Sequence, residues 1–123
     1  MVWAEITLPP GEPRPELERV LREVIQRQTR RVDWGRRAGE PVEARLVVTE
    51  LSAVVTRGVV RVTCAGYGRL RRDHQGGTAG KTARSRFSMG GHPKDRDALE
   101  RHLLTMLGRG IVTRLADIAR AGL

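Results

Sequence analysis

Hydrophobic and polar residues follow regular patterns along this chain, and each pattern predicts one element. Over residues 2–8 the two kinds alternate with a period of two, which is typical of a half-buried strand. We expect the hydrophobic members of this alternation to share the core face, namely Val2, Ala4, Ile6 and Leu8. A proline-rich connection follows and separates this strand from the next element.

After the connection, hydrophobic residues recur every three or four positions, which is the spacing of one helix face. They are Leu17, Val20, Leu21, Val24 and Ile25. Pro15 suits a first helical turn and the pattern fades near Asp33, so we predict a helix between these two positions. We expect the ring of Trp34 to fold back over the end of this helix and join the core.

The middle of the chain predicts two strands joined by a tight turn. Hydrophobic residues alternate from Val42 to Val48, and the alternation then slips by one position near Thr49 and Glu50, which indicates a bulge. A two-residue turn at 57–58 would bring hydrophobic residues opposite one another on a single face. The expected pairs are Val55 with Val60, Ala53 with Val62, and Leu51 with Cys64.

A second hairpin is expected to follow the first. Ala83, Ser85, Phe87 and Met89 alternate with polar residues, so these four side chains should face the core. The connection from about Arg71 to Gly80 is long and rich in glycine, and we expect a flexible loop there.

A long helix is expected to complete the domain. Pro93 suits its first turn, and a hydrophobic stripe continues nearly to the C-terminus: Leu99, Leu103, Leu107, Ile111, Leu115 and Ile118. Gly108 and Gly110 interrupt the stripe, which predicts a close packing contact or a kink. The element order β-α-β-β-β-α therefore predicts a single two-layer α+β domain over residues 1–123, with a mostly antiparallel sheet and both helices on one face.

Charge is distributed unevenly along this sequence of 123 residues, whose net charge is +9. Basic and acidic residues cancel from Met1 to Thr56, so the whole excess lies from Arg57 onward. The predicted site for an anion or a partner consists of Arg61, Arg69, Arg71, Arg72, Lys81, Arg84 and Arg86. We expect Arg61, Arg84 and Arg86 on the sheet face opposite the helices, and the others beside the glycine-rich loop.

A basic patch of this kind favours nucleic acid, anionic lipid or an acidic protein surface. Two explanations without a ligand stay open for the basic patch. The first is that an uncovered sheet face must be polar in any case. The preference for arginine over lysine, which occurs only at Lys81 and Lys94, would also follow from a codon bias. Aromatic residues make up 3% of the chain, so nucleic-acid binding would rest on backbone phosphates and depend strongly on salt.

The stretch GGTAGKT, residues 76–82, is similar to a phosphate-binding P-loop. The P-loop motif requires glycine at the position of Gln75 and a helix after Thr82, whereas the sequence beyond Thr82 has the alternation of a strand. Paired metal ligands and an activated nucleophile are not evident either. We therefore expect neither catalytic activity nor a bound cofactor.

Two resemblances bear on function. The order α-β-β-β-α resembles the double-stranded RNA-binding domain, although this chain reads Pro93-Lys94-Asp95-Arg96-Asp97 where that family carries a lysine cluster. The hairpin Val54 to Cys64 and the tail ARSRFSMGGHPKDRDALERHLL are similar to small α+β domains of bacterial envelope lipoproteins and assembly factors from high-GC Gram-negative bacteria. The second resemblance implies a binding or assembly role.

These observations predict a non-catalytic module that contacts a protein partner, or a second copy of itself, through a basic sheet face or a strand edge. The alternative is a nucleic-acid-binding domain that uses the basic hairpin. The chain as given would be cytoplasmic, and it would belong to the bacterial periplasm or envelope if a signal segment has been removed.

Overall fold

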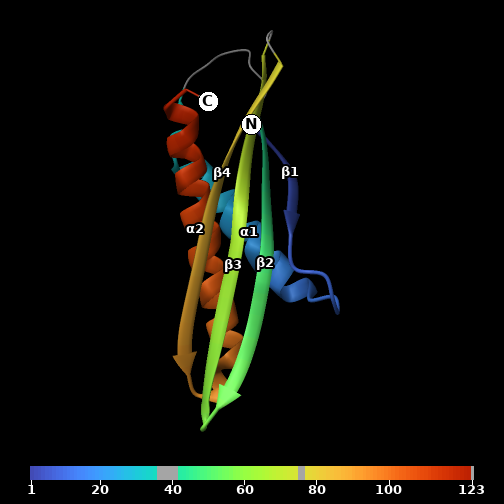
Figure 1. Ribbon diagram of the computed structural model, residues 1–123, viewed down its shortest axis with the longest axis vertical. Coiled ribbons are helices and arrows are strands. Elements are labelled where there is room, and N and C mark those ends of the chain that lie inside the picture. Colours follow the sequence, from blue (N-terminus) through green and yellow to red (C-terminus); the bar gives the residue numbers. More distant parts are fainter. Residues whose placement is uncertain (36–41, 75–76, 123) are drawn as a thin grey trace.

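The computed structural model describes residues 1–35, 42–74 and 77–122, with the side chains of residues 73–79 left out of the description. Two helices pack against one face of a four-stranded sheet, so the domain has two layers (Figure 1). A short 3-10 turn at Pro93–Asp95 precedes the second helix. The elements in chain order are β1 (Val2–Thr7), α1 (Pro15–Arg31), β2 (Val42–Thr56), β3 (Val59–His74), β4 (Gly77–Gly91) and α2 (Arg96–Arg120).

The sheet has the strand order β1-β2-β3-β4. β1 runs parallel to β2, and the pairs β2–β3 and β3–β4 are antiparallel. A parallel pair needs a long crossover connection, and α1 is part of that connection. The predicted α+β class and element order are confirmed, and the sheet is mixed through its one parallel pair.

The predicted hairpin between β2 and β3 is confirmed. Its central residues Arg57 and Gly58 have φ angles of 53° and 76°, and positive values at both positions characterise the type I′ turn that fits the twist of a hairpin. The three expected hydrophobic pairs are all present in the register. The register shifts between Val48 and Glu50, where the bulge was predicted.

β1 differs from its prediction because it also contains a bulge. The pairing with β2 shifts between Trp3 and Glu5, so Trp3 rather than Ala4 lies on the same face as Ile6. The Trp3 indole packs beside the core and donates a hydrogen bond from Nε1 to Thr29 Oγ1 of α1, 3.1 Å away. Val2 is 68% exposed, so its predicted core position is wrong.

The expected loop from Arg71 to Gly80 is also wrong. β3 continues to His74 and β4 begins at Gly77, with Arg71 paired to Gly80 and His74 paired to Gly77. Only Gln75 and Gly76 of this stretch lie outside the described residues. Glycine is compatible with extended backbone, and its abundance here gave a misleading loop signal.

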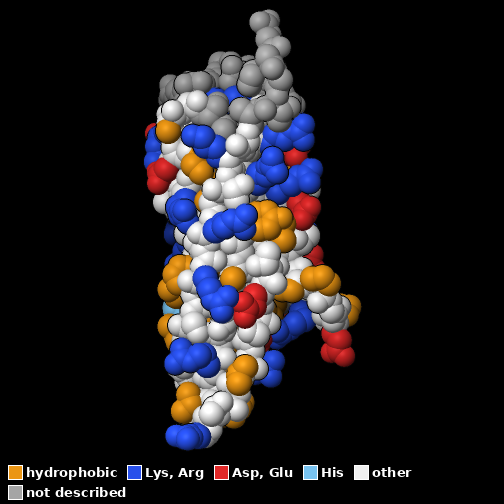
Figure 2. Space-filling view, in the orientation of Figure 1, with side chains coloured by type: hydrophobic (Ala, Val, Ile, Leu, Met, Phe, Trp, Pro, Cys, Tyr) orange, Lys and Arg blue, Asp and Glu red, His pale blue; other side chains and the backbone are white. Residues whose placement is uncertain are grey.

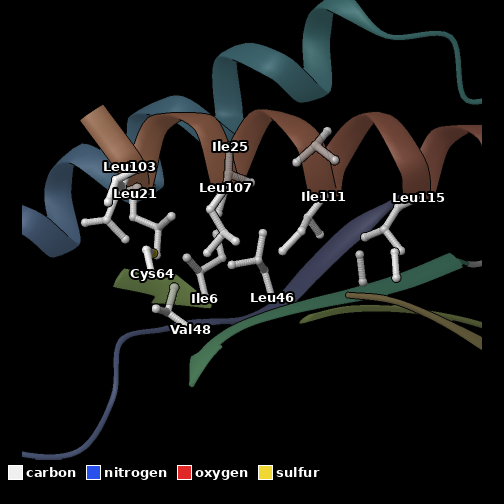
Figure 3. Packing of buried hydrophobic residues seen from close by; sticks show 14 of the residues in the cluster. Ile6, Leu21, Ile25, Leu46, Val48, Cys64, Leu103, Leu107, Ile111 and Leu115 are labelled. Atoms are coloured by element: carbon white, nitrogen blue, oxygen red, sulfur yellow. The ribbon is translucent and has the colours of Figure 1, made fainter. Parts of the chain in front are cut away.

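The core lies between the sheet and the two helices. Side chains of α1 and α2, among them Leu21, Ile25, Leu107 and Ile111, point toward Ile6, Leu46, Val48 and Cys64 of the strands (Figure 3). Trp34 packs at the rim of this cluster, and its Nε1 donates to the Thr29 carbonyl oxygen at 2.9 Å. The ring therefore folds back over the end of α1, as predicted.

α2 lies close to the sheet because β3 carries two glycines beneath it. A Cβ atom on Gly68 would lie 2.3 Å from Ile111 Cγ2, and one on Gly66 would lie 3.2 Å from Leu107 Cδ2. Within α2, a Cβ on Gly108 would meet Val24 of α1 at 3.1 Å, whereas one on Gly110 would meet nothing within 4 Å. The predicted close contact therefore exists at Gly108 and not at Gly110.

The carboxylate of Glu100 lies inside the protein, and the sequence pattern did not indicate its burial. Glu100 of α2 is 1% exposed and forms a two-point ion pair with Arg14, at 2.6 Å and 3.0 Å. Arg96 Nε lies 3.6 Å from Glu100 Oε1. The hydrogen bonds to Glu100 raise the pKa of Arg14 above its usual value. The pair fastens the proline-rich connection before α1 to the start of α2.

Candidate binding site on the open sheet face

The sheet face opposite the helices, called the open face here, carries most of the predicted site. Figure 2 shows basic side chains spaced along it from one end to the other, with acidic ones between them. Cross-strand partners share a face, so the register assigns these residues to it. Among the residues whose side chains are described, its charged members are Glu5, Glu43, Arg45, Glu50, Arg61, Arg69, Arg71, Arg84 and Arg86.

Two predicted site residues, Arg72 and Lys81, belong to the other face. Leu70 is buried under the helices, and Arg72, two positions further along β3, points to the same side and is 5% exposed. Lys81 pairs with Leu70 and shares the side of the buried Ala83, although its own side chain is exposed. Neither residue flanks a loop, because both lie within paired strands.

Part of the positive charge on the open face is neutralised within it. Arg86 and Glu50 both pair with Ala65, and their side chains reach across this small residue to form an ion pair of 2.8 Å. Arg45 lies 3.1 Å from Glu43 and 3.9 Å from Glu5. Arg86 is therefore less available to a partner than its sequence position indicated.

Arg69 and Arg84 have no acidic partner among the residues whose side chains are described. The Arg84 guanidinium lies 5.6 Å from the centroid of the Tyr67 ring, within the range of a cation–π contact. The Arg69 guanidinium lies against Gly80, where a Cβ would be 3.3 Å from its Nε and Nη2 atoms. Both guanidinium groups lie beside neutral neighbours on the surface.

A hollow of about 380 Å³ is lined by Arg69 and by Tyr67, the ring that Arg84 contacts. Half-buried Val47 and Tyr67 give it a partly apolar floor. Its lining residues are Glu5, Glu43, Arg45, Val47, Tyr67, Arg69, Arg71 and Gly80. Its acidic side and Arg45 were not among the predicted site residues, although the alternation of Glu43, Arg45 and Val47 with buried residues places all three on this face.

Cys64 takes no part in the open face, because its side chain is buried in the core. Burial, with a smaller contribution from the Glu50 carboxylate, raises the pKa of the thiol from 9.0 to about 12. Since thiolate is the reactive form, we expect a thiol reagent such as DTNB to leave the folded protein unlabelled at about pH 8 and to label it in denaturant.

The same pKa difference makes stability depend on pH. The thiol keeps its proton in the folded protein while the unfolded chain loses it above its pKa of 9.0, so this contribution to stability is present below that pH. Stability should then fall as the pH rises toward about 12, the pKa of the Cys64 thiol in the folded protein. A Cys64→Ala variant, followed by denaturant unfolding, should show a shallower alkaline decline. Rapid labelling of the folded protein would contradict both expectations.

The comparisons with known proteins concern the fold. No helix within the described residues is both long and apolar enough to cross a bilayer. No protein-family model matches the chain, and no curated protein matches it.

Among solved structures, a "putative lipoprotein" from Caulobacter crescentus CB15 is similar over 98% of this chain and 92% of its own, with a TM-score of 0.53 and 16% identity. An uncharacterised protein matches at a TM-score of 0.35 and 20% identity, over 85% of this chain and 63% of its own. The chain thus shares its two-layer α+β fold with the Caulobacter protein.

Proposed function

We propose that this protein is a non-catalytic binding module that holds an acidic segment of a protein partner on its open face. The observation that carries the proposal is the pair Arg69 and Arg84, which lack an acidic partner among the described side chains. Arg69 lines a partly apolar hollow, and Arg84 contacts the ring of Tyr67, which lines the same hollow. The resemblance to envelope lipoproteins and assembly factors extends the proposal to an assembly role in the bacterial envelope.

The two arginines are suited to this task because both lie beside neutral groups. The Tyr67 ring restricts Arg84, so less of the side-chain freedom of Arg84 is lost on binding, and Arg69 lies against Gly80, which has no side chain to cover it. Guanidinium groups bind carboxylates through two parallel hydrogen bonds, which are among the stronger polar contacts in proteins. Val47 and Tyr67 would contact the apolar part of the same segment.

The open face suits an acidic protein better than a nucleic acid. Glu5, Glu43 and Glu50 lie among its arginines, so a continuous phosphate backbone would meet repulsion at several points. Tyr67 already carries Arg84 on its ring, which leaves less of that ring to stack on a base. A nucleic-acid complex would rest on phosphate contacts from Arg61, Arg69, Arg71, Arg84 and Arg86 and would weaken steeply with salt.

The test is a binding titration with labelled peptides in which glutamate alternates with valine or phenylalanine, followed by fluorescence anisotropy. Arg69→Glu/Arg84→Glu should weaken binding at least about tenfold, since each lost contact between a guanidinium and a carboxylate is replaced by repulsion. Arg27→Glu/Arg109→Glu is the matched control. It changes the net charge equally on exposed helix positions and should bind like the unmodified protein.

Two results would count against the proposal. One is equal loss of binding in both double variants, which would indicate attraction to the net charge alone. The other is tighter binding of duplex RNA or DNA than of the acidic peptide at physiological salt, which would favour the nucleic-acid function.

A further inference from the structure

The end of the β2–β3 hairpin exposes hydrophobic side chains that the open face does not use. We call residues 54–59 the hairpin tip. Val54, Val55 and Val59 are 61%, 58% and 49% exposed. Apart from Met1 and Val2, no other large hydrophobic side chain in the described part of the chain is classed as exposed. A concentration of exposed apolar groups of this kind marks a contact surface.

The hairpin tip has apolar groups on both of its faces. β1 pairs with β2 only as far as Val47, and β4 pairs with β3 only as far as Val60, so residues 56–59 extend beyond both neighbouring strands. Val54 lies opposite Arg61 on the open face, whereas Val55 lies opposite the buried Val60 on the helix side. A flat partner would cover one face alone, but a socket would cover both.

The turn at the end of the hairpin tip carries a positive charge. Arg57 is exposed at the turn and forms no ion pair with the described residues. In a lipid bilayer this charge would enter deeper than the valines behind it, which is costly. Because the cation lies at the turn and the valines lie behind it, the tip instead fits a cleft in a protein that offers both apolar side chains and carboxylates.

The chain itself contains a cleft lined by both kinds of group, apolar side chains and carboxylates. A cleft of about 470 Å³ lies between the proline-rich connection and the first turns of α2. Pro13, Pro15 and Leu17 line it together with the carboxylates of Glu12, Glu16 and Asp97. Its two basic side chains are engaged, because Arg14 is held by Glu100 and Arg101 lies 3.6 Å from Glu16.

Two of the carboxylates are available to a cation from outside. Glu12 and Asp97 form no ion pair with the described residues. Asp97 adds to the negative potential that raises the pKa of Arg14, so its charge is felt within the cleft. This free negative charge complements Arg57.

We propose that the hairpin tip of one copy inserts into this cleft of a second copy, and that the second copy does the same in return. Both features lie toward the same end of the molecule, because β4 ends opposite Val60 and leads directly into the start of α2, which carries Asp97 (Figure 1). Reciprocal insertion around a two-fold axis then closes a dimer, and each copy contributes one tip and one cleft.

The test is sedimentation velocity of the whole chain over a range of concentrations. At about 0.15 M salt the repulsion between two copies of a +9 protein is screened beyond roughly 8 Å, so local contacts decide the outcome. We expect the unmodified protein to dimerise. Arg57→Glu and Glu12→Lys should each raise the dimer dissociation constant at least about tenfold, because each creates two like-charge contacts.

Mixing the two variants separates this arrangement from a general charge effect. A heterodimer of Arg57→Glu with Glu12→Lys has opposite charges at both contacts, so an equimolar mixture should dimerise where neither variant does alone. The double variant Arg57→Glu/Glu12→Lys should dimerise by itself. Val54→Thr/Val55→Thr/Val59→Thr keeps the β-branched shape and should remain folded by circular dichroism while losing the dimer.

A protein that is monomeric at every concentration would overturn the proposal. So would a dimer that the charge reversals leave unchanged, or a mixture of variants that fails to associate. Binding of a monomeric chain to anionic phospholipid vesicles through the three valines would assign the tip to a lipid surface instead. None of these measurements involves the acidic peptide, so failure here is distinct from failure of the proposed open-face function.

Discussion

Arg14→Met is expected to destabilise the folded protein by about 3 kcal/mol, because it leaves the carboxylate of Glu100 buried without its main partner. Arg14 itself is 39% exposed and Arg96 remains 3.6 Å from the carboxylate, so we expect a value at the low end of the range for broken buried ion pairs. Methionine keeps the apolar stem of arginine, so the change reports on the charge. Urea unfolding followed by circular dichroism measures the difference.

Two variants serve as controls for this result. Arg22→Met removes a partner from the exposed pair with Glu18 and should cost less than about 1 kcal/mol. Arg14→Met/Glu100→Met removes both charges of the buried pair and should recover much of the loss, because apolar replacements of a buried ion pair are often tolerated. If Arg14→Met lowers the free energy of unfolding no more than Arg22→Met does, the buried pair does not stabilise the contact between the connection and α2.

Gly68→Ala is expected to cost about 2 kcal/mol or more through steric overlap. The added Cβ would lie 2.3 Å from Ile111 Cγ2 and 2.8 Å from Leu115 Cδ1, so α2 would have to move away from the sheet or the two side chains would have to change rotamer. Thermal and denaturant unfolding both report this loss, and the affinity of the open face for an acidic peptide should change little.

Gly110→Ala, in the same helix α2, is expected to raise stability rather than lower it. Beyond the adjoining helix backbone, no atom lies within 4 Å of the added Cβ, and alanine favours a helix interior over glycine, so this variant should gain about 0.5–1 kcal/mol. Equal effects of the two substitutions would contradict the assignment of Gly68 as the site of close approach between α2 and β3.

The sequence was sufficient for the elements whose hydrophobic period is strict. α1, α2 and the β2–β3 hairpin were predicted correctly, including the bulge before Glu50, because pairing at Arg57 and Gly58 aligned the hydrophobic residues on one face. β1 was assigned to the wrong face over its first residues. A strand of six residues carries too short an alternation to reveal a bulge, and the change of phase is visible only in the pairing with β2 and in the contact between Trp3 and Thr29.

The candidate site was predicted in part. The arginines of the open face follow from alternation, but whether each is neutralised depends on side chains from strands distant in sequence, such as Glu50 opposite Arg86. Arg72 was misplaced because a loop was expected where β3 continues. Glu100 lies three positions before the buried Leu103, and this spacing could have indicated that it faces the core.

The free edge of the sheet has a consequence for aggregation. β4 is the outer strand, and a long unpaired edge is a template for adding identical chains. Arg114 of α2 donates to the Arg84 carbonyl oxygen, which already occupies one backbone acceptor of this strand. Antiparallel self-pairing centred on Ser85 would also set Arg84 opposite Arg86, where like charges oppose one another. Arg84, which the proposed function assigns to an acidic partner, would therefore also discourage fibrous stacking of the sheet along β4.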